Sequence, residues 1–269
     1  MPSAGWWKEF YASERISLME HGMEALFHNA PAIELSRNGA IIFPHTKLSV
    51  SGHLIAAAAR AVMESACESV LVLGVLHLGD RRDEKKFRGI HGLGAPFDKG
   101  IWRDEFSLDN FEAMLGIAAR LAGKRMPTLL ARYPFLTGEH PESLQGFEEL
   151  VALTQQGVAI MVTADLVHHG TGYGTPEPLR LDREDSETLA WAEREIDAQL
   201  STLLRKDFIG FLAHCETARS DFRDAGPVLA SLLPLTTQSS ILNVSLVNYS
   251  DVLNAEEPTW VAAALAKFD

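Results

Sequence analysis

Short, β-rich apolar runs alternate along the chain with longer stretches in which apolar residues recur at helical spacing. The short runs predict strands at residues 40–43, 70–75, 158–164 and 241–247. The longer stretches predict helices at residues 54–63, 142–154 and 185–204. Alternation of this kind is typical of an α/β fold in which helices cover both faces of a sheet.

One long helix and one polar segment stand out in this pattern. The helix predicted at residues 185–204 carries Leu189, Ile196 and Leu200 at helical spacing, and we expect these side chains in the core. Residues 77–106 are polar, mix both charge signs and contain five glycines, which predicts a long loop. No repeat or linker divides the chain, so residues 1–269 are expected to form a single domain.

The composition indicates a globular protein that acts on small molecules or proteins. Hydrophobic residues make up 46% of the sequence, and the formal net charge is -12, which opposes binding to nucleic acids and to anionic membranes. The two cysteines, Cys67 and Cys215, form no disulfide framework and favour a reducing compartment. The N-terminus has no signal-peptide pattern, and no apolar run is long enough to cross a membrane. We therefore expect a cytoplasmic protein.

Three histidines lie just beyond the carboxyl ends of three predicted strands. His45, His77 and His168 follow the first, second and third of these strands. In open α/β sheets this edge binds ligands, because the loops there converge on one crevice. Imidazole is a common ligand of zinc, iron and copper, so the three positions predict a metal site.

The motifs around these histidines resemble those of the Memo-like protein family (AmmeMemoRadiSam system protein B). They are P44-H45 with S51-G52, G74-x-x-H77, E139-H140 and D165-x-x-H168-x-G170, in the family's order. The resemblance extends to N248-Y-S-D251 and to residues 259–265, which the family would place in a helix. Memo-like proteins share their fold with the class III extradiol dioxygenases, which are non-haem iron enzymes that open catechol rings. The resemblance implies a central, mostly parallel sheet flanked by helices.

The resemblance also implies roles for individual residues. His45 and His77 would be metal ligands, and a third ligand would come from a late helix. Cys215 has the residue type found in Memo-like proteins, whereas Asp224 has nearly the matching position before Gly226-Pro227, which favours Asp224. His168 would be the catalytic base, with Asp165 holding its tautomer. His140 would be a second acid of the pocket.

Several functions agree with this ligand set. The first is a non-haem iron(II) oxidoreductase with a small-molecule substrate, for which the resemblance implies an aromatic ring. Zinc or copper are alternative metals, and a zinc-dependent hydrolase would use the same histidines with a carboxylate base. A non-enzymatic module could instead bind an acidic ligand or peptide through Lys47. No G-x-S-x-G, P-loop or G-x-G-x-x-G motif supports a serine hydrolase or a nucleotide enzyme. The sequence leaves a homo-oligomer open.

Overall fold

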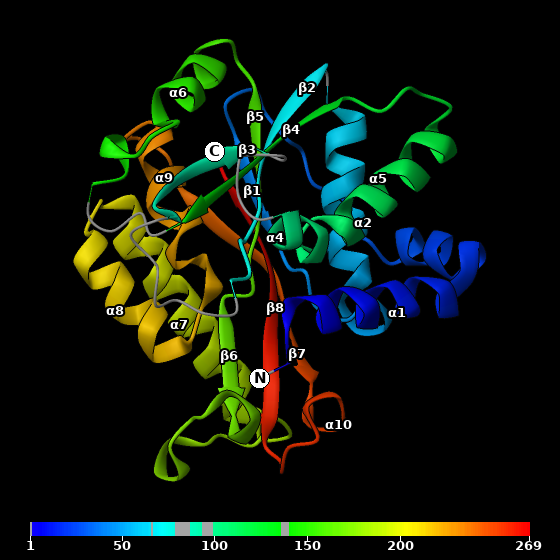
Figure 1. Ribbon diagram of the computed structural model, residues 1–269, viewed down its shortest axis with the longest axis vertical. Helices are drawn as coiled ribbons and strands as arrows, with labels where there is room; N and C mark the ends of the chain where they lie inside the picture. Colours follow the sequence, from blue (N-terminus) through cyan, green and yellow to red (C-terminus); the bar gives the residue numbers. More distant parts are fainter. Residues whose placement is uncertain (1, 66, 79–86, 93–98, 136–139) are drawn as a thin grey trace.

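The computed structural model describes residues 2–65, 67–78, 87–92, 99–135 and 140–269. Within these residues the chain forms one mixed sheet with helices on both faces (Figure 1). The strands follow the order β3-β4-β2-β5-β1-β8, and β8 also pairs with β6 and β7. Their bounds are β1 Ala40–Phe43, β2 Ser69–Leu73, β3 Gly89–Gly92, β4 Thr128–Phe135, β5 Ala159–Thr163, β6 Val167–Gly170, β7 Ser239–Asn248 and β8 Thr259–Phe268.

The core of the sheet is parallel, as expected. β4, β2, β5 and β1 lie side by side in one direction, whereas β3, β6, β7 and β8 run antiparallel to their neighbours. The four predicted strands correspond to β1, β2, β5 and β7, with ends that shift by at most two residues. Because parallel strands direct their carboxyl ends to one edge of the sheet, the residues that follow β1, β2 and β5 meet there.

Two groups of helices cover the two faces. Side chains of β1 alternate between them: Ile41 and Phe43 belong to one core cluster, and Ala40 and Ile42 to the other. The first face carries α1 (Ala4–Ala25), α2 (Leu48–Glu64) and α5 (Asp109–Ala122), and the second carries α6 (Phe147–Gln155), α7 (Ser186–Leu204), α8 (Phe208–Ala218) and α9 (Ala225–Leu232). The predicted helices correspond to α2, to α6 with a preceding 3-10 turn, and to α7. Ile196 and Leu200 of α7 are buried as expected, whereas Leu189 is 39% exposed.

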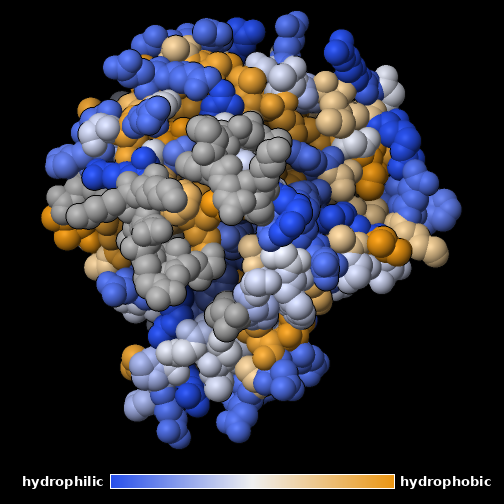
Figure 2. All heavy atoms as spheres, in the orientation of Figure 1, coloured by the Kyte–Doolittle hydropathy of each residue, from blue (hydrophilic) through white to orange (hydrophobic). Residues whose placement is uncertain are grey.

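The surface mixes polar and apolar groups. Hydrophilic side chains cover much of the periphery in Figure 2, with apolar atoms between them. None of the helices in the described part of the chain has both the length and the apolar character needed to cross a bilayer.

The segment expected as a helix at residues 259–265 is instead the strand β8. Its alanines favour a helix in isolation, but its side chains alternate between the two cores. Val261 and Leu265 pack on the face of α2, whereas Trp260 packs on the opposite face. Pairing with three strands outweighs the local helix propensity.

His168 lies at the expected edge of the sheet. It lies within strand β6, however, and not beyond the end of a strand. β7 pairs with residues 260–268 of β8, so β1 and β6 share the other edge of β8. β1 pairs with residues 266–268 and β6 with residues 259–262. Strand β6 therefore lies beyond the carboxyl end of β1, and His168 lies within it.

The polar segment at residues 77–106 is not one continuous loop. It contains β3, which pairs with β4, and the short helix α4 (Lys99–Asp104). Residues 79–86 and 93–98 of the segment lie outside the described residues. Glu105 and Phe106, at its end, are buried and return to the carboxyl ends of the strands.

Gly170, the last residue of β6, is expected to tolerate no side chain. Its φ is 100° and its ψ is -169°, a region that is essentially restricted to glycine, and an added Cβ would lie 1.8 Å from the carbonyl oxygen of Pro258. Gly170→Ala should lower the free energy of unfolding by more than about 2 kcal/mol. Gly174→Ala is the matched control, because Gly174 also has positive φ but has open space around it. Equal melting temperatures for the two variants would contradict the prediction.

Candidate metal centre

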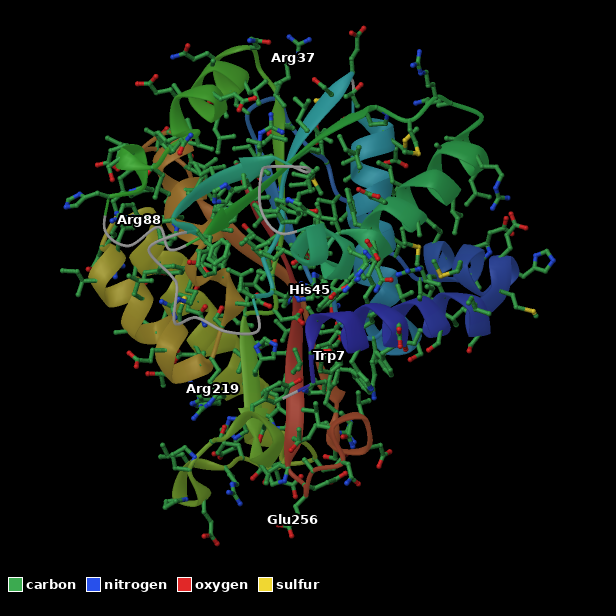
Figure 3. The ribbon with its side chains drawn as sticks, in the orientation of Figure 1. Trp7, Arg37, His45, Arg88, Arg219 and Glu256 are labelled. Carbon is green, nitrogen blue, oxygen red and sulfur yellow. The ribbon has the colours of Figure 1, made fainter. Side chains whose placement is uncertain are left out.

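A cavity of about 330 Å³ lies at the carboxyl ends of the parallel strands. Polar and aromatic side chains share its wall, and Figure 3 shows His45 near the end of β1 with Trp7 of α1 beside it. The polar residues that line it are His45, His77, Asp165, His168 and Asp221, together with Arg219. The aromatic residues are Trp7, Tyr11, Phe106, Tyr173 and Tyr249. Four of these six polar residues are among the predicted site residues; Asp221 and Arg219 are not.

His45 follows β1 directly and is held on two sides. Its backbone N–H donates to Oδ1 of Asp165 (3.2 Å), and its Nδ1 lies 3.1 Å from the Thr163 hydroxyl. These contacts leave Nε2 directed at carboxylates, 3.2 Å from Oδ2 of Asp221 and 3.7 Å from Oδ2 of Asp165.

His77 is oriented by a buried carboxylate that the sequence did not reveal. Glu105 accepts hydrogen bonds from the backbone N–H of His77 (2.7 Å) and from its Nδ1 (3.2 Å). The imidazole also stacks on Phe106, with ring centroids 4.2 Å apart. Burial opposes ionisation of Glu105, but the His77 ring and these hydrogen bonds lower the pKa of its carboxyl group. Nδ1 of His77 is thus the donor, and Nε2 keeps its lone pair for a ligand.

Glu105→Gln should weaken metal binding while the fold is retained. The amide binds the imidazole N–H less strongly than the carboxylate does, and loss of such an outer partner typically costs about 10–100-fold in metal affinity. Competition with a chelator would measure the change. Glu149→Gln, at a side chain that is 56% exposed and pairs with Arg132, should leave the affinity unchanged. Equal affinities of the two variants would remove Glu105 from the site.

The close group of possible ligand atoms pairs the two histidines with Asp221, and not with Asp224 or Cys215, the two candidates from the sequence. One ligand atom each from His45, His77 and Asp221 lies within 4.8 Å of the others, and this group includes neither Asp224 nor Cys215. Asp221 is fixed against Asp165: its Oδ1 accepts the Asp165 backbone N–H at 2.8 Å, and its own N–H donates to the Asp165 carbonyl at 3.3 Å.

Asp224 and Cys215 have other surroundings. Asp224 is buried at the N-terminus of α9, one turn beyond Asp221. Cys215 is buried in α8 with its thiol 3.7 Å from the side-chain oxygen of Gln199 in α7, and burial raises the pKa of this thiol. A protonated, buried thiol directed at a neighbouring helix is a packing residue.

His168 lies next to this group, with a ring nitrogen within 4.8 Å of a carboxylate oxygen of Asp221. Its Nδ1 donates to the backbone carbonyl of Arg219 at 2.8 Å, because a carbonyl oxygen can only accept. The tautomer is therefore set by Arg219 and not by Asp165, whose Oδ2 lies 4.0 Å from Nε2 of His168. The lone pair of Nε2 remains available, and Asp165, His168 and Asp221 form a second close group of ligand atoms.

The cluster requires positive charge. Burial disfavours charge on His45, but Asp165 and Asp221 outweigh it and raise the pKa of His45 to about 9. Burial raises the pKa of Asp165, whereas for Asp221 the histidines overcome burial and lower the pKa. Either a proton on His45 or a cation compensates the carboxylates. Two imidazole nitrogens and a carboxylate oxygen form a donor set that fits a divalent metal ion.

The cavity lining includes none of the residues His140, Lys47 and His169. The His140 side chain is 73% exposed and 3.8 Å from Glu142, so the structure does not place it as an acid of the pocket. Nζ of Lys47 donates to the Asn248 carbonyl at 2.7 Å, and Lys47 is not among the residues that line the cavity. His169 faces the other side of β6, where it stacks on Trp260.

The fold and the site together define an α/β protein with a candidate divalent-metal centre at the carboxyl edge of its sheet. No protein-family model matches the chain, and no curated protein matches it. The likeness to Memo-like proteins therefore rests on the motifs given above.

Proposed function

We propose that the protein is a metal-dependent enzyme in which His45, His77 and Asp221 hold one divalent ion, iron(II), for oxidation of a small aromatic substrate. The observation that carries this proposal is the close approach of the three ligand atoms, within 4.8 Å of one another. Two histidines and one carboxylate on one face of an ion are the ligand set of non-haem iron oxygenases, which leaves other positions open. When bound, iron supplies electron transfer between an organic substrate and dioxygen.

The residues around this group support an aromatic substrate. Among the described residues, five aromatic side chains line the cavity, and its volume of about 330 Å³ is near the lower end for ligand sites, which suits a single ring. His168 accepts the proton of a substrate hydroxyl at Nε2, because its Nδ1 already donates to the Arg219 carbonyl. The carboxylate of Asp165, 4.0 Å away, stabilises the resulting imidazolium.

The test is metal analysis of protein purified without oxygen, followed by oxygen uptake with a panel of catechols. We expect about one iron per chain and oxygen consumption that depends on the catechol. Protein that neither carries metal nor retains added iron would overturn the proposal and favour a metal-free binding module.

A zinc-dependent hydrolase is the second candidate, and Asp165 is the observation that favours it. This buried second carboxylate lies 3.7 Å from Nε2 of His45, and burial raises the pKa of its carboxyl group, as suits a general base for water. Zinc in the purified protein, with ester or amide turnover and no oxygen uptake, would decide for the hydrolase.

A further inference from the structure

Two buried tyrosines from opposite ends of the chain share a hydrogen bond in the cavity wall. The hydroxyls of Tyr11 in α1 and Tyr249, which follows β7, lie 2.9 Å apart. The Tyr249 oxygen also accepts the backbone N–H of Lys47 at 3.1 Å. Both side chains are at most 4% exposed, and both line the cavity.

The two phenolic hydroxyls carry two protons, and their hydrogen bonds use only one of them. Each hydroxyl has one proton to donate, and the bond between them uses one of the two. The contact with Lys47 uses a lone pair of Tyr249 and no phenolic proton. In the described part of the chain, neither hydroxyl makes a further hydrogen bond, whichever of them donates to the other. One O–H donor is therefore left for an atom in the cavity.

Aromatic contacts connect the pair to a candidate metal ligand and to the candidate base. On one side, Tyr11 packs on Phe106 (5.5 Å between ring centroids), and Phe106 stacks on His77. On the other side, Tyr249 packs on Tyr173 (6.4 Å), and Tyr173 packs on His168 (4.8 Å). A ring bound between His77 and His168 therefore has the two phenols along the same wall.

Both hydroxyls remain donors at neutral pH. Burial raises the pKa of Tyr11 and of Tyr249 well above the ordinary value, and the charge of Asp165 raises both further. An unused donor in a buried wall has a cost unless water or a ligand accepts it.

We propose that the Tyr11–Tyr249 pair donates its remaining phenolic proton to an oxygen atom of the bound substrate. The inference rests on the proposed function and narrows its substrate class to single-ring aromatics with an acceptor oxygen, such as a phenolate or carbonyl, on the side of α1. The hydrogen bond stabilises the bound substrate most when the acceptor oxygen is negatively charged, because hydrogen bonds to charged oxygens are the stronger ones.

The test uses 4-nitrocatechol, whose ionisation is visible in its absorbance, bound to protein loaded with zinc so that no oxidation occurs. Its Kd and its pKa in the bound state would be measured for wild type, Tyr11→Phe, Tyr249→Phe and the double variant. We expect the double variant to bind the probe about 10-fold or more weakly and to raise the pKa of the bound probe. The single variant that removes the contacting phenol should account for most of this change.

Tyr133→Phe is the matched control, because Tyr133 is a buried tyrosine outside the cavity lining. It should leave the Kd and the probe pKa unchanged. If the double variant does not fold, as judged by its melting temperature, the two single variants decide. Wild-type affinity and probe pKa in all folded phenylalanine variants would overturn the inference while leaving the proposed function intact. Failure of 4-nitrocatechol to bind the metal-loaded wild type would overturn the proposed substrate class, and the inference with it.

Discussion

Asp221→Asn is expected to reduce metal affinity by more than about 100-fold, because the substitution removes the anionic ligand itself. Loss of a residue that only hydrogen-bonds to a ligand typically costs about 10–100-fold. The asparagine oxygen can still accept the Asp165 backbone N–H, so the local fold should be kept. His45→Ala and His77→Ala should abolish metal binding. Metal content after anaerobic purification and gel filtration would measure all three variants.

Asp224→Asn and Cys215→Ser are the controls for this set. Neither residue belongs to the close group of ligand atoms, so both variants should retain the metal. Stronger loss from Asp224→Asn than from Asp221→Asn would return the third ligand to the position that the sequence favours. If His45→Ala and His77→Ala both keep stoichiometric metal, the ion is bound elsewhere.

The part of the site that follows parallel strands could be predicted from the sequence. The apolar run at residues 40–43 matches β1, and that at residues 70–75 overlaps β2, so each fixes the place of the histidine beyond it. The carboxyl ends of such strands share one edge, and His45 and His77 meet there with ring centroids 5.4 Å apart.

The third ligand could not be chosen in this way. Asp221 and Asp224 are one turn apart in a segment without apolar periodicity, and only tertiary contacts distinguish them. Ser220 caps the turn at Phe222, and the backbone of Asp221 pairs with that of Asp165, 56 residues earlier. Asp224 is left to start α9.

The residues that orient the site were hidden for similar reasons. Glu105 lies in a polar segment that reads as a loop, and nothing in the local pattern indicates that it returns to His77. Tyr11 and Tyr249 are separated by 238 positions. Their contact depends on β8 being a strand, because β7 pairs with it and leads to Tyr249. The resemblance to Memo-like proteins implied a helix there.

His168→Ala is expected to keep metal and fold while losing about 10²–10⁴-fold in turnover, which is the usual contribution of a positioned general base. His45, His77 and Asp221 already supply three ligands, and a fourth from the protein would occupy a position that substrate or oxygen needs. The Arg219 carbonyl holds Nδ1 of His168 and leaves Nε2 as an acceptor toward the cavity. This arrangement suits a base better than a metal ligand that is bound throughout the reaction.

His169→Ala is the control next in sequence. Its ring stacks on Trp260 and accepts the backbone N–H of Leu181 at 2.8 Å, so its removal should lower the melting temperature but leave turnover per folded molecule nearly unchanged. Metal content, melting temperature and rate are to be measured on both variants. Lower stability with normal turnover in His168→Ala would make that residue a part of the cavity wall only. Loss of metal from His168→Ala would instead make His168 a metal ligand, together with Asp165 and Asp221 of the second close group. A general base is not needed to hold the ion when no substrate is present.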